Sequence, residues 1–283
     1  MHHANVFYGH AEVLARYCGL EPPPTIWGYL QHGWNTHDGF AVGHEFVAGY
    51  PKLVWSHSVA RRGRSLGGCD YIAVGSPWAY LLALHADASP GPGPGGSALM
   101  HDNARGTIVY PFHGWEGQQI VGDHGTYAAQ IRASEGEEPV TVCLYWNDYE
   151  NPMVHRAYRD AGFRVITHGR RGHLYLGGDR DFLDRQFDEL CSHRRAVSNR
   201  MGSALLYAAS LGLAIGVYGD PMVLAGDHAV LGGMARQERM FPALHHAHVE
   251  QAAAHDIAGR ELGLDLTLSP GLLAHTLGWD KFA

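Results

Sequence analysis

Lysine is nearly absent from this sequence of 283 residues, where it occurs only at positions 52 and 281. Arginine supplies almost all of the 21 basic residues, against 28 acidic ones, and the formal net charge is −7. Basic residues form only short clusters, among them the runs 61–64 and 170–171. Because a nucleic-acid-binding protein usually presents a basic face, this balance argues against nucleic acid as the main partner.

The sequence also lacks the marks of secretion and of membrane insertion. Its four cysteines form no CxxC pair, which favours reduced thiols in the cytoplasm. The N-terminus has no basic-then-apolar signal pattern, and no apolar run approaches the roughly 20 residues that span a bilayer. With 46% hydrophobic and 17% charged residues, the composition is that of a globular protein. We therefore expect a cytoplasmic protein whose membrane contact is at most peripheral.

Several well-known catalytic and metal-binding motifs are missing as well. GxxxxGK[ST] does not occur. GxGxxG matches only within the Pro/Gly-rich run 89–96, and GxSxG only at residues 63–67, at the end of an expected helix. Neither match lies at an expected strand-to-helix turn, so dinucleotide-binding, P-loop and hydrolase functions lose their usual motif support. Histidine is abundant, with 21 residues. His245, His246, His248 and His255 have spacings that would suit zinc on one helix face. Because no HExxH pattern or cysteine accompanies them, an exposed helix is favoured, and we predict no metal site.

Strands and helices are expected to alternate along the whole chain. The length suits two domains, and the polar, proline-terminated segment 134–139 is typical of a linker. We place an N-terminal acceptor-side domain at residues 1–134 and a C-terminal nucleotide-sugar domain at 135–283, with the helix near Trp279 returning to the first. The Pro/Gly-rich run 89–96 is predicted as a loop. Short apolar strands between amphipathic helices predict parallel sheets with helices on both faces. The expected strands are 25–31, 53–55, 71–74, 108–110, 140–146, 163–167, 195–197 and 214–218, and the expected helices are 12–17, 58–66, 77–85, 118–133, 152–160, 179–190, 202–211, 247–262 and 271–277.

The most distinctive local pattern is the strand–turn–helix sequence from Val197 to Tyr207. Ser198, Asn199, Gly202 and Ser203 place small residues, hydroxyls and backbone amides where the helix begins. The helix dipole and unpaired amides at such a point favour an anion such as a diphosphate. Ser and Asn are also the preferred helix N-caps, so a plain cap explains the same pattern equally well.

Polar residues follow three other predicted strands of the second domain. Because ligands bind at the carboxyl ends of strands in open α/β sheets, these positions are candidates for a donor pocket. They are Tyr145, Asn147, His168 and Asp220. Arg170 and Arg171 could clamp a phosphate there, although exposed Arg pairs are more often solvated.

Two His–Gly turns follow predicted strands of the first domain, at His32 and His113. A histidine on a glycine-bounded turn can accept a proton or contact phosphate, while a turn histidine bonded to backbone is the common alternative. Asp38 and the pair His44–Glu45 could supply a carboxylate base nearby.

The ordered segments QHGW, LVWS, VGSPWAYL, YPFHGWE, VTVCLYWNDY, VITHG and SNRMGSALLYAASLGLAIGVYGD resemble bacterial surface-polysaccharide glycosyltransferases of the GT-B fold. More broadly, the sequence resembles capsular polysialyltransferases and teichoic-acid glycerophosphotransferases. The resemblance implies two Rossmann-like domains facing a cleft, with the nucleotide held mainly by the second and no metal or other cofactor required. It matches Ser198–Ser203 to the family's phosphate loop, and His32 and His113 to its histidine turns. The sequence departs from the family in a short N-terminal domain and in lacking a clear carboxylate base.

These observations predict an α/β glycosyltransferase that moves a sugar from a nucleotide-activated donor to a glycan or small-molecule acceptor. A glycerophosphotransferase using the same phosphate site is an alternative. A non-catalytic nucleotide-sugar-binding protein is a second one.

Overall fold

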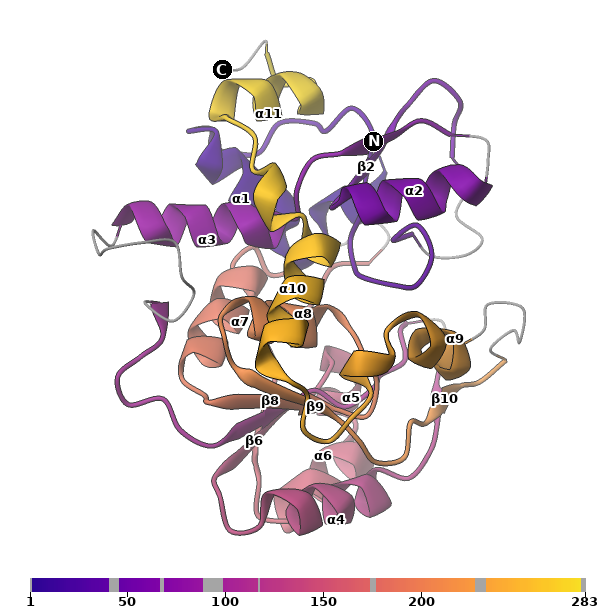
Figure 1. The fold of residues 1–283 in the computed structure, drawn as a ribbon, viewed down its shortest axis with the longest axis vertical. Coiled ribbons are helices and arrows are strands. Elements are labelled where there is room, and N and C mark those ends of the chain that lie inside the picture. The colour runs from indigo at the N-terminus through magenta and orange to yellow at the C-terminus, as the bar shows by residue number, and fades with distance from the viewer. Residues whose placement is uncertain are drawn as a thin grey trace. The chain divides into compact units, whose positions relative to one another are not determined.

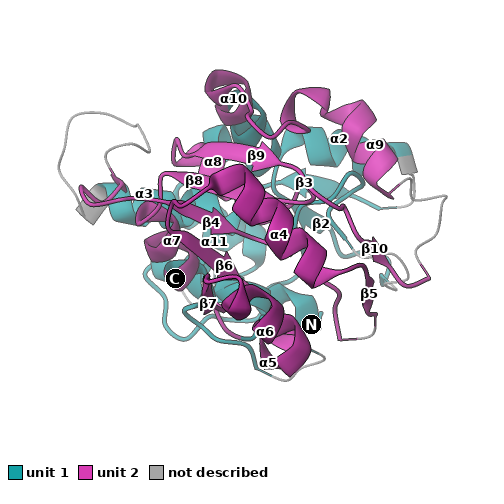
Figure 2. Ribbon diagram, turned by 90° about the horizontal axis from the view of Figure 1, so that it is seen from below, with its two compact units in different colours: residues 1–95, 170–184, 256–283 teal, residues 96–169, 185–255 magenta. Residues whose placement is uncertain are grey.

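The computed structural model describes residues 2–40, 46–66, 69–88, 99–116, 118–173, 177–226 and 233–280. It is a mixed α/β structure with parallel sheets, as predicted from the sequence. The chain divides into two compact units (Figure 2). Unit 1 comprises residues 1–95, 170–184 and 256–283, and unit 2 comprises residues 96–169 and 185–255. The run 89–96 and the pair His44–Glu45 lie outside the described residues.

Unit 1 is built on a three-stranded parallel sheet in the order β1-β2-β3. Each strand is two or three residues long and is followed by a loop or a helix. Its elements are η1 (His3–Gly9), α1 (His10–Tyr17), β1 (Tyr29–Leu30), β2 (Lys52–Val54), α2 (His57–Leu66), β3 (Tyr71–Ala73), α3 (Pro77–Ala88), η5 (Leu264–Leu266) and α11 (Pro270–Leu277). Residues 256–283 belong to this unit, which confirms the expected return of the C-terminal helix.

Serine hydroxyls begin two helices of unit 1 directly after strands. Ser56 Oγ accepts from the Val59 amide at 3.2 Å at the start of α2, and Ser76 Oγ accepts from the Ala79 amide at 3.2 Å at the start of α3. These bonds satisfy amides that have no partner within the helix. They place the helix starts at the carboxyl ends of β2 and β3.

Unit 2 contains a five-stranded parallel sheet in the order β7-β6-β4-β8-β9. The chain moves outward from β4 through β6 to β7, then returns to form β8 and β9 on the other side of β4. An antiparallel pair, β10 with β5, lies apart from this sheet. The strands are β4 (Thr107–Val109), β5 (Ile120–Val121), β6 (Val140–Cys143), β7 (Arg164–Ile166), β8 (Arg195–Ser198), β9 (Ala214–Val217) and β10 (Val223–Leu224).

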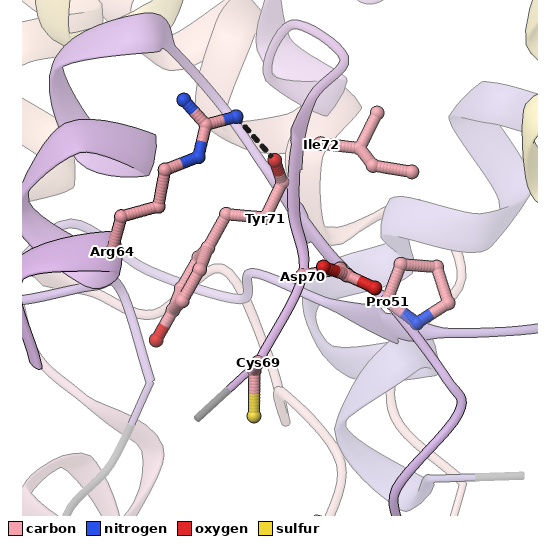
Figure 3. Close-up of a pocket in the computed structure, with 6 residues that line it drawn as sticks. All are labelled: Pro51, Arg64, Cys69, Asp70, Tyr71 and Ile72. Carbon is pink, nitrogen blue, oxygen red and sulfur yellow. Dashed lines mark hydrogen bonds between the residues drawn. The ribbon is translucent and has the colours of Figure 1, made fainter. Parts of the chain in front are cut away.

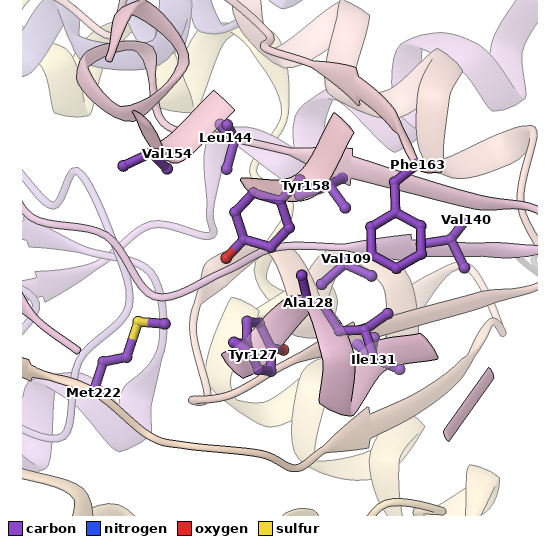
Figure 4. Packing of buried hydrophobic residues seen from close by; sticks show 12 residues of the cluster. Val109, Tyr127, Ala128, Ile131, Val140, Leu144, Val154, Tyr158, Phe163 and Met222 are labelled. Atoms are coloured by element: carbon purple, nitrogen blue, oxygen red, sulfur yellow. The ribbon is translucent and has the colours of Figure 1, made fainter. Parts of the chain in front are cut away.

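Helices cover both faces of the five-stranded sheet (Figure 1). On one face, Val109, Val142 and Val197 pack with Tyr127 of α4 and Tyr158 of α6 in a fully buried cluster (Figure 4). Helices α7 and α8 lie on the other face of the sheet (Figure 1), and alternate residues of a strand face opposite sides of a sheet. The helices are α4 (His124–Glu135), α5 (Trp146–Glu150), α6 (Pro152–Asp160), α7 (Phe182–Cys191), α8 (Ser203–Ser210), α9 (Gly233–Met240), η4 (Pro242–Leu244) and α10 (Gln251–Leu262), of which α7 and α10 have their other ends in unit 1.

The domain boundary predicted at residues 134/135 requires correction. Ile108 pairs with Thr141 and Val109 with Val142, so the strands on either side of segment 134–139 are neighbours in one sheet. That segment is a helix-to-strand connection inside unit 2. Its polar, glycine-containing composition suits a surface loop as well as a linker, because both lack a buried face.

Two predicted helices begin later than expected. The helix expected from residue 118 begins at His124, because Asp123 accepts hydrogen bonds from the Gly125 and Thr126 amides and caps it. Residues 120–121 form β5 instead. The helix expected from residue 247 begins at Gln251, where Glu250 accepts from the amides of Ala252 and Ala253. His245, His246 and His248 therefore precede α10 and do not share its face with His255.

Two features sought in the sequence have no counterpart in the part of the chain that the structure describes. Within those residues, no helix is both long and apolar enough to cross a membrane. Nor does any group of three or more His, Cys, Asp or Glu side chains in the same ranges form a potential metal site.

Candidate functional site

The strand order of unit 2 makes one edge of its sheet the candidate position for a ligand. Connections leave β4 toward β6 on one side, whereas β8 lies on its other side, so the chain direction reverses between β4 and β8. In open α/β sheets, ligands bind outside the carboxyl ends of the strands at such a reversal. The residues that follow β4 and β8 are 110–116 and 199–203. They include His113 and three of the four residues predicted to hold phosphate.

Helix α8 begins at this edge without a side-chain cap. Its N-cap is Gly202, in an extended conformation with φ −160° and ψ 178°. Because glycine has no side chain, the N-cap residue makes no side-chain hydrogen bond to the first amides of the helix. Ser203 is the first helical residue. The Ser198 hydroxyl instead accepts from the Arg200 amide at 3.2 Å. The plain-cap explanation therefore does not account for Ser198 or Asn199, since neither caps α8.

Asn199 connects three strand ends. Its Oδ1 accepts from the Phe112 amide at 2.7 Å, after β4, and its Nδ2 donates to the Asp220 carbonyl at 2.6 Å, after β9. The side chain is almost fully buried, with 1% of its surface exposed. Asn199 thus fixes the loops around the edge of the sheet, and its amide group is used for that purpose.

Arg200 reinforces the same junction. Its guanidinium lies over the Phe112 ring at 4.0 Å, donates from Nε to the Pro221 carbonyl at 2.7 Å, and also donates to the Met222 carbonyl. Met222 has a positive φ of 47°, which is uncommon for residues other than glycine. The Asp220 carboxylate accepts from the Met222 amide at 2.9 Å within this turn. Predicted residue Asp220 therefore shapes the turn after β9.

His113 and Tyr145 are stacked at the ends of β4 and β6. Their ring centroids lie 4.3 Å apart with planes inclined by 10°. The imidazole Nδ1 lies 2.6 Å from the Gly114 carbonyl, which can only accept, so neutral His113 carries its proton on Nδ1. Its basic nitrogen is then Nε2. His113 is exposed, and the structure places it in unit 2, together with the predicted nucleotide residues.

Glu116 is a carboxylate that the sequence did not single out. Its Oε1 accepts from the Tyr145 hydroxyl at 2.7 Å and from the Trp146 indole at 3.1 Å. Both donors follow β6, whereas Glu116 follows β4, so the parallel pairing of these strands brings them together. The missed signal is the segment FHGWE, whose glutamate ends the same turn as His113.

Two further acidic or amide side chains lie in the first turn of α5. Asn147 and Asp148 are partly buried there. Burial raises the pKa of Asp148 to about 6. A carboxyl group with such a pKa can exchange a proton near neutral pH.

The other two predicted site histidines have different surroundings. His168 is buried, its Nε2 lies 3.1 Å from the Tyr110 hydroxyl, and burial lowers its pKa to about 4, so it is neutral at pH 7. His32 lies in unit 1 after β1, with its ring edge-on to Phe7 at 5.5 Å. Arg171 places its guanidinium 4.6 Å from the same Phe7 ring, also within unit 1.

A surface pocket lies elsewhere in unit 1, at the amino ends of β2 and β3 (Figure 3). Its volume is about 530 Å³, and it is lined by Pro51, Arg64, Cys69, Asp70, Tyr71 and Ile72. Behind it, the Asp38 carboxylate accepts from the Lys52 ammonium and from the Tyr71 hydroxyl, each at 2.7 Å. Asp38, which the sequence offered as a base near His32, is thus bonded to Lys52 and Tyr71. Because Lys52 and Tyr71 are paired residues of β2 and β3, these bonds link the two strands of unit 1.

These features define an α/β protein whose larger unit has the strand order of a Rossmann-type sheet, with a polar edge at the reversal point. No known family model and no curated protein matches the chain. Among solved structures, it is similar to Staphylococcus aureus MnaA with UDP (10% identity, TM-score 0.37, covering 78% of this chain and 54% of that one). It is similar to the wall teichoic acid polymerase TagF, with 9% identity and a TM-score of 0.37, covering 81% of this chain and 54% of that one. It is also similar to Arabidopsis thaliana UGT89C1 with UDP, with 11% identity and a TM-score of 0.30, covering 81% of this chain and 53% of that one. The chain spans about half the length of each.

Proposed function

We propose that this protein is a glycosyltransferase that binds the diphosphate of a nucleotide-activated sugar at the carboxyl edge of the unit 2 sheet. The observation that carries the proposal is the start of α8 at the reversal point between β4 and β8, with glycine as its N-cap. The first amides of a helix lack partners within it, and their dipoles favour a negative charge. A glycine cap lets a phosphate approach the backbone closely.

In the proposed reaction, the acceptor hydroxyl attacks the anomeric carbon of the donor sugar. Its proton passes to Nε2 of His113, while the bond between the anomeric carbon and the diphosphate oxygen breaks. The electron pair of that bond leaves with the nucleoside diphosphate, whose new charge faces Ser203 and the amides of α8. Tyr145 and Gly114 hold the imidazole in place, and Tyr145, Asn147, His168 and Asp220 surround the donor. His32 of unit 1 is proposed to act on the acceptor.

A glycerophosphotransferase would use the same diphosphate site and differ in the atom attacked, which would be phosphorus. A non-catalytic nucleotide-sugar-binding protein would bind the donor without turnover. Release of free nucleoside diphosphate from a nucleotide sugar in the presence of an acceptor separates the transferase from the binding protein. Release of a nucleoside monophosphate from a CDP-glycerol donor would identify the phosphotransferase.

The first experiment is a thermal-shift screen of nucleoside diphosphates and nucleotide sugars. A ligand present at about 100 times its Kd stabilises the folded state by about 2.7 kcal/mol, so the responding base would identify the donor class. Because amides and a helix dipole face the diphosphate, we expect binding and turnover to persist in EDTA. Turnover lost in EDTA and restored by Mg²⁺ or Mn²⁺ would contradict this part of the proposal.

A further inference from the structure

Two aromatic side chains of unit 1 are exposed and lie with their ring planes nearly parallel. Trp27 and Tyr50 leave 54% and 42% of their surfaces exposed, whereas Trp55 and Trp78 of the same unit are fully buried. The rings of Trp27 and Tyr50 are nearly parallel, with centroids 6.3 Å apart and planes 18° apart. We call this pair the aromatic platform.

The platform is held rigidly by the backbone around it. The Trp27 amide donates to the Leu277 carbonyl at 3.0 Å, at the end of α11. Gly278, with φ +76°, lies so close to the indole that a Cβ atom there would come within 2.6 Å of its Cδ1. Tyr50 is supported by the edge of Tyr29, whose ring centroid lies 6.4 Å away. These contacts restrict both rings, and restriction before binding lowers the entropic cost of binding.

Two polar residues are close in the chain to Gly278, which contacts Trp27. His275 and Asp280 flank Gly278 in the chain, and Nδ1 of His275 lies 2.7 Å from Oδ2 of Asp280. Both side chains are mostly exposed, at 72% and 54%. The carboxylate can accept hydrogen bonds from hydroxyl groups, and the imidazole can donate or accept them. Exposed aromatic rings and groups able to bind hydroxyls thus belong to the same region of unit 1.

We propose that the aromatic platform binds a saccharide whose pyranose rings carry equatorial hydroxyls. Such a ring has two faces covered by C–H groups, which pack against the electron-rich faces of Trp27 and Tyr50, while hydroxyls at its edge bond to Asp280 and His275. Two rings with a charged rim are too small and too polar for a stable protein interface, which buries about 1,200 Å² or more.

This site goes beyond the proposed diphosphate site, with which it shares no residue. If unit 2 transfers a sugar, the saccharide on the platform is the acceptor, and only this assignment rests on the proposed function. Binding to the platform is measured without any nucleotide, so the two proposals can fail separately.

The test is calorimetric titration of the full chain with cellohexaose and with maltohexaose, which differ in the linkage between their glucose units. We expect saturable binding to at least one of them. Trp27→Ala and Tyr50→Ala should each weaken it by about tenfold or more, equal to about 1.4 kcal/mol. Asp280→Asn should weaken it less. Met153→Ala removes an even more exposed apolar side chain from unit 2, 83% exposed, and should leave binding unchanged.

Thermal melting controls for folding, and Trp27→Phe provides a second variant that keeps a ring in place and should retain most of the affinity. The proposal is overturned if neither oligosaccharide binds the parent protein, or if the alanine variants fold and bind as well as the parent. It is also overturned if Trp27→Ala instead abolishes self-association of the chain or binding to lipid vesicles. Nucleotide binding that persists in Trp27→Ala shows that the diphosphate site is independent.

Discussion

The imidazole of His113 lies flat against the phenol ring of Tyr145, at 4.3 Å and 10°. The stack fixes where the imidazole lies, while the Gly114 carbonyl fixes which nitrogen carries its proton. His113 is therefore held by groups that do not themselves need to react.

If His113 is the proton acceptor, His113→Asn should lower kcat by about 10²–10⁴-fold, the usual contribution of a general base. Tyr145→Phe keeps the stack but loses the bond to Glu116, so its kcat should stay close to that of the parent. Tyr145→Ala removes the stack and should lower kcat and change the pH profile. Equal losses in Tyr145→Phe and Tyr145→Ala would assign the effect to the bond with Glu116 instead.

Ser203→Ala tests the diphosphate site at the start of α8. A hydrogen bond to a charged group contributes about 1.5–3 kcal/mol, so nucleotide affinity should fall by about ten- to a hundredfold. Because Gly202 is the N-cap, the melting temperature should change little. Calorimetric titration reports the affinity, and thermal melting reports the stability. A variant that melts earlier but binds nucleotide like the parent would place the donor site elsewhere.

The buried histidines His10 and His168 should make the fold sensitive to acid. Burial lowers the pKa of His10 to about 3 and that of His168 to about 4. Below pH 6.5, the unfolded chain binds protons that these folded histidines do not, so stability is lost as the pH falls toward their folded pKa values. At pH 5 each histidine should lower the free energy of unfolding by about 2 kcal/mol relative to pH 7.5.

His10→Phe should remove one of these two contributions. Within the described residues, Nδ1 of His10 is buried and has no hydrogen-bond partner, so an apolar ring of similar size should not weaken the fold at pH 7.5. Urea denaturation at pH 7.5 and pH 5 should show a smaller acid effect in this variant. His101→Gln changes an exposed histidine and serves as the control. An unchanged pH dependence in His10→Phe would contradict the assignment.

The buried pair Lys52 and Asp38 should be required as a unit. Burial alone would raise the pKa of Asp38, but hydrogen bonds from Lys52 and Tyr71 and the charge of Lys52 outweigh it and lower the pKa. Asp38→Asn leaves the ammonium buried without its counter-charge and should cost about 3–5 kcal/mol of stability. The double variant Asp38→Asn/Lys52→Met should be more stable than Asp38→Asn alone in urea denaturation. Additive losses would show that the two side chains act independently.

Local sequence patterns predicted most of the elements, because strands and helices in this chain have clear apolar periods and caps. The pairing of β4 with β6 could not be predicted from them, since the 134–139 segment has the composition of either a loop or a linker. The grouping of several candidate site residues could be predicted from the parallel strands. Residues at the ends of parallel strands meet at one edge, which brings His113, Tyr145 and Ser198–Ser203 to the same side of the sheet of unit 2. Glu116 was missed because its partners, Tyr145 and Trp146, lie 29 and 30 residues further along the chain.

The division of unit 1 into three chain segments has a consequence for the order of folding during synthesis. Glu261 binds Arg62 through two hydrogen bonds, at 2.9 and 2.7 Å, and accepts from the Trp34 indole at 2.7 Å, although it follows Arg62 by 199 residues. A ribosome therefore completes all of unit 2 before it adds the last segment of unit 1. Until then the first 95 residues have an unfinished core, and an unfinished core exposes apolar surface to chaperones and proteases.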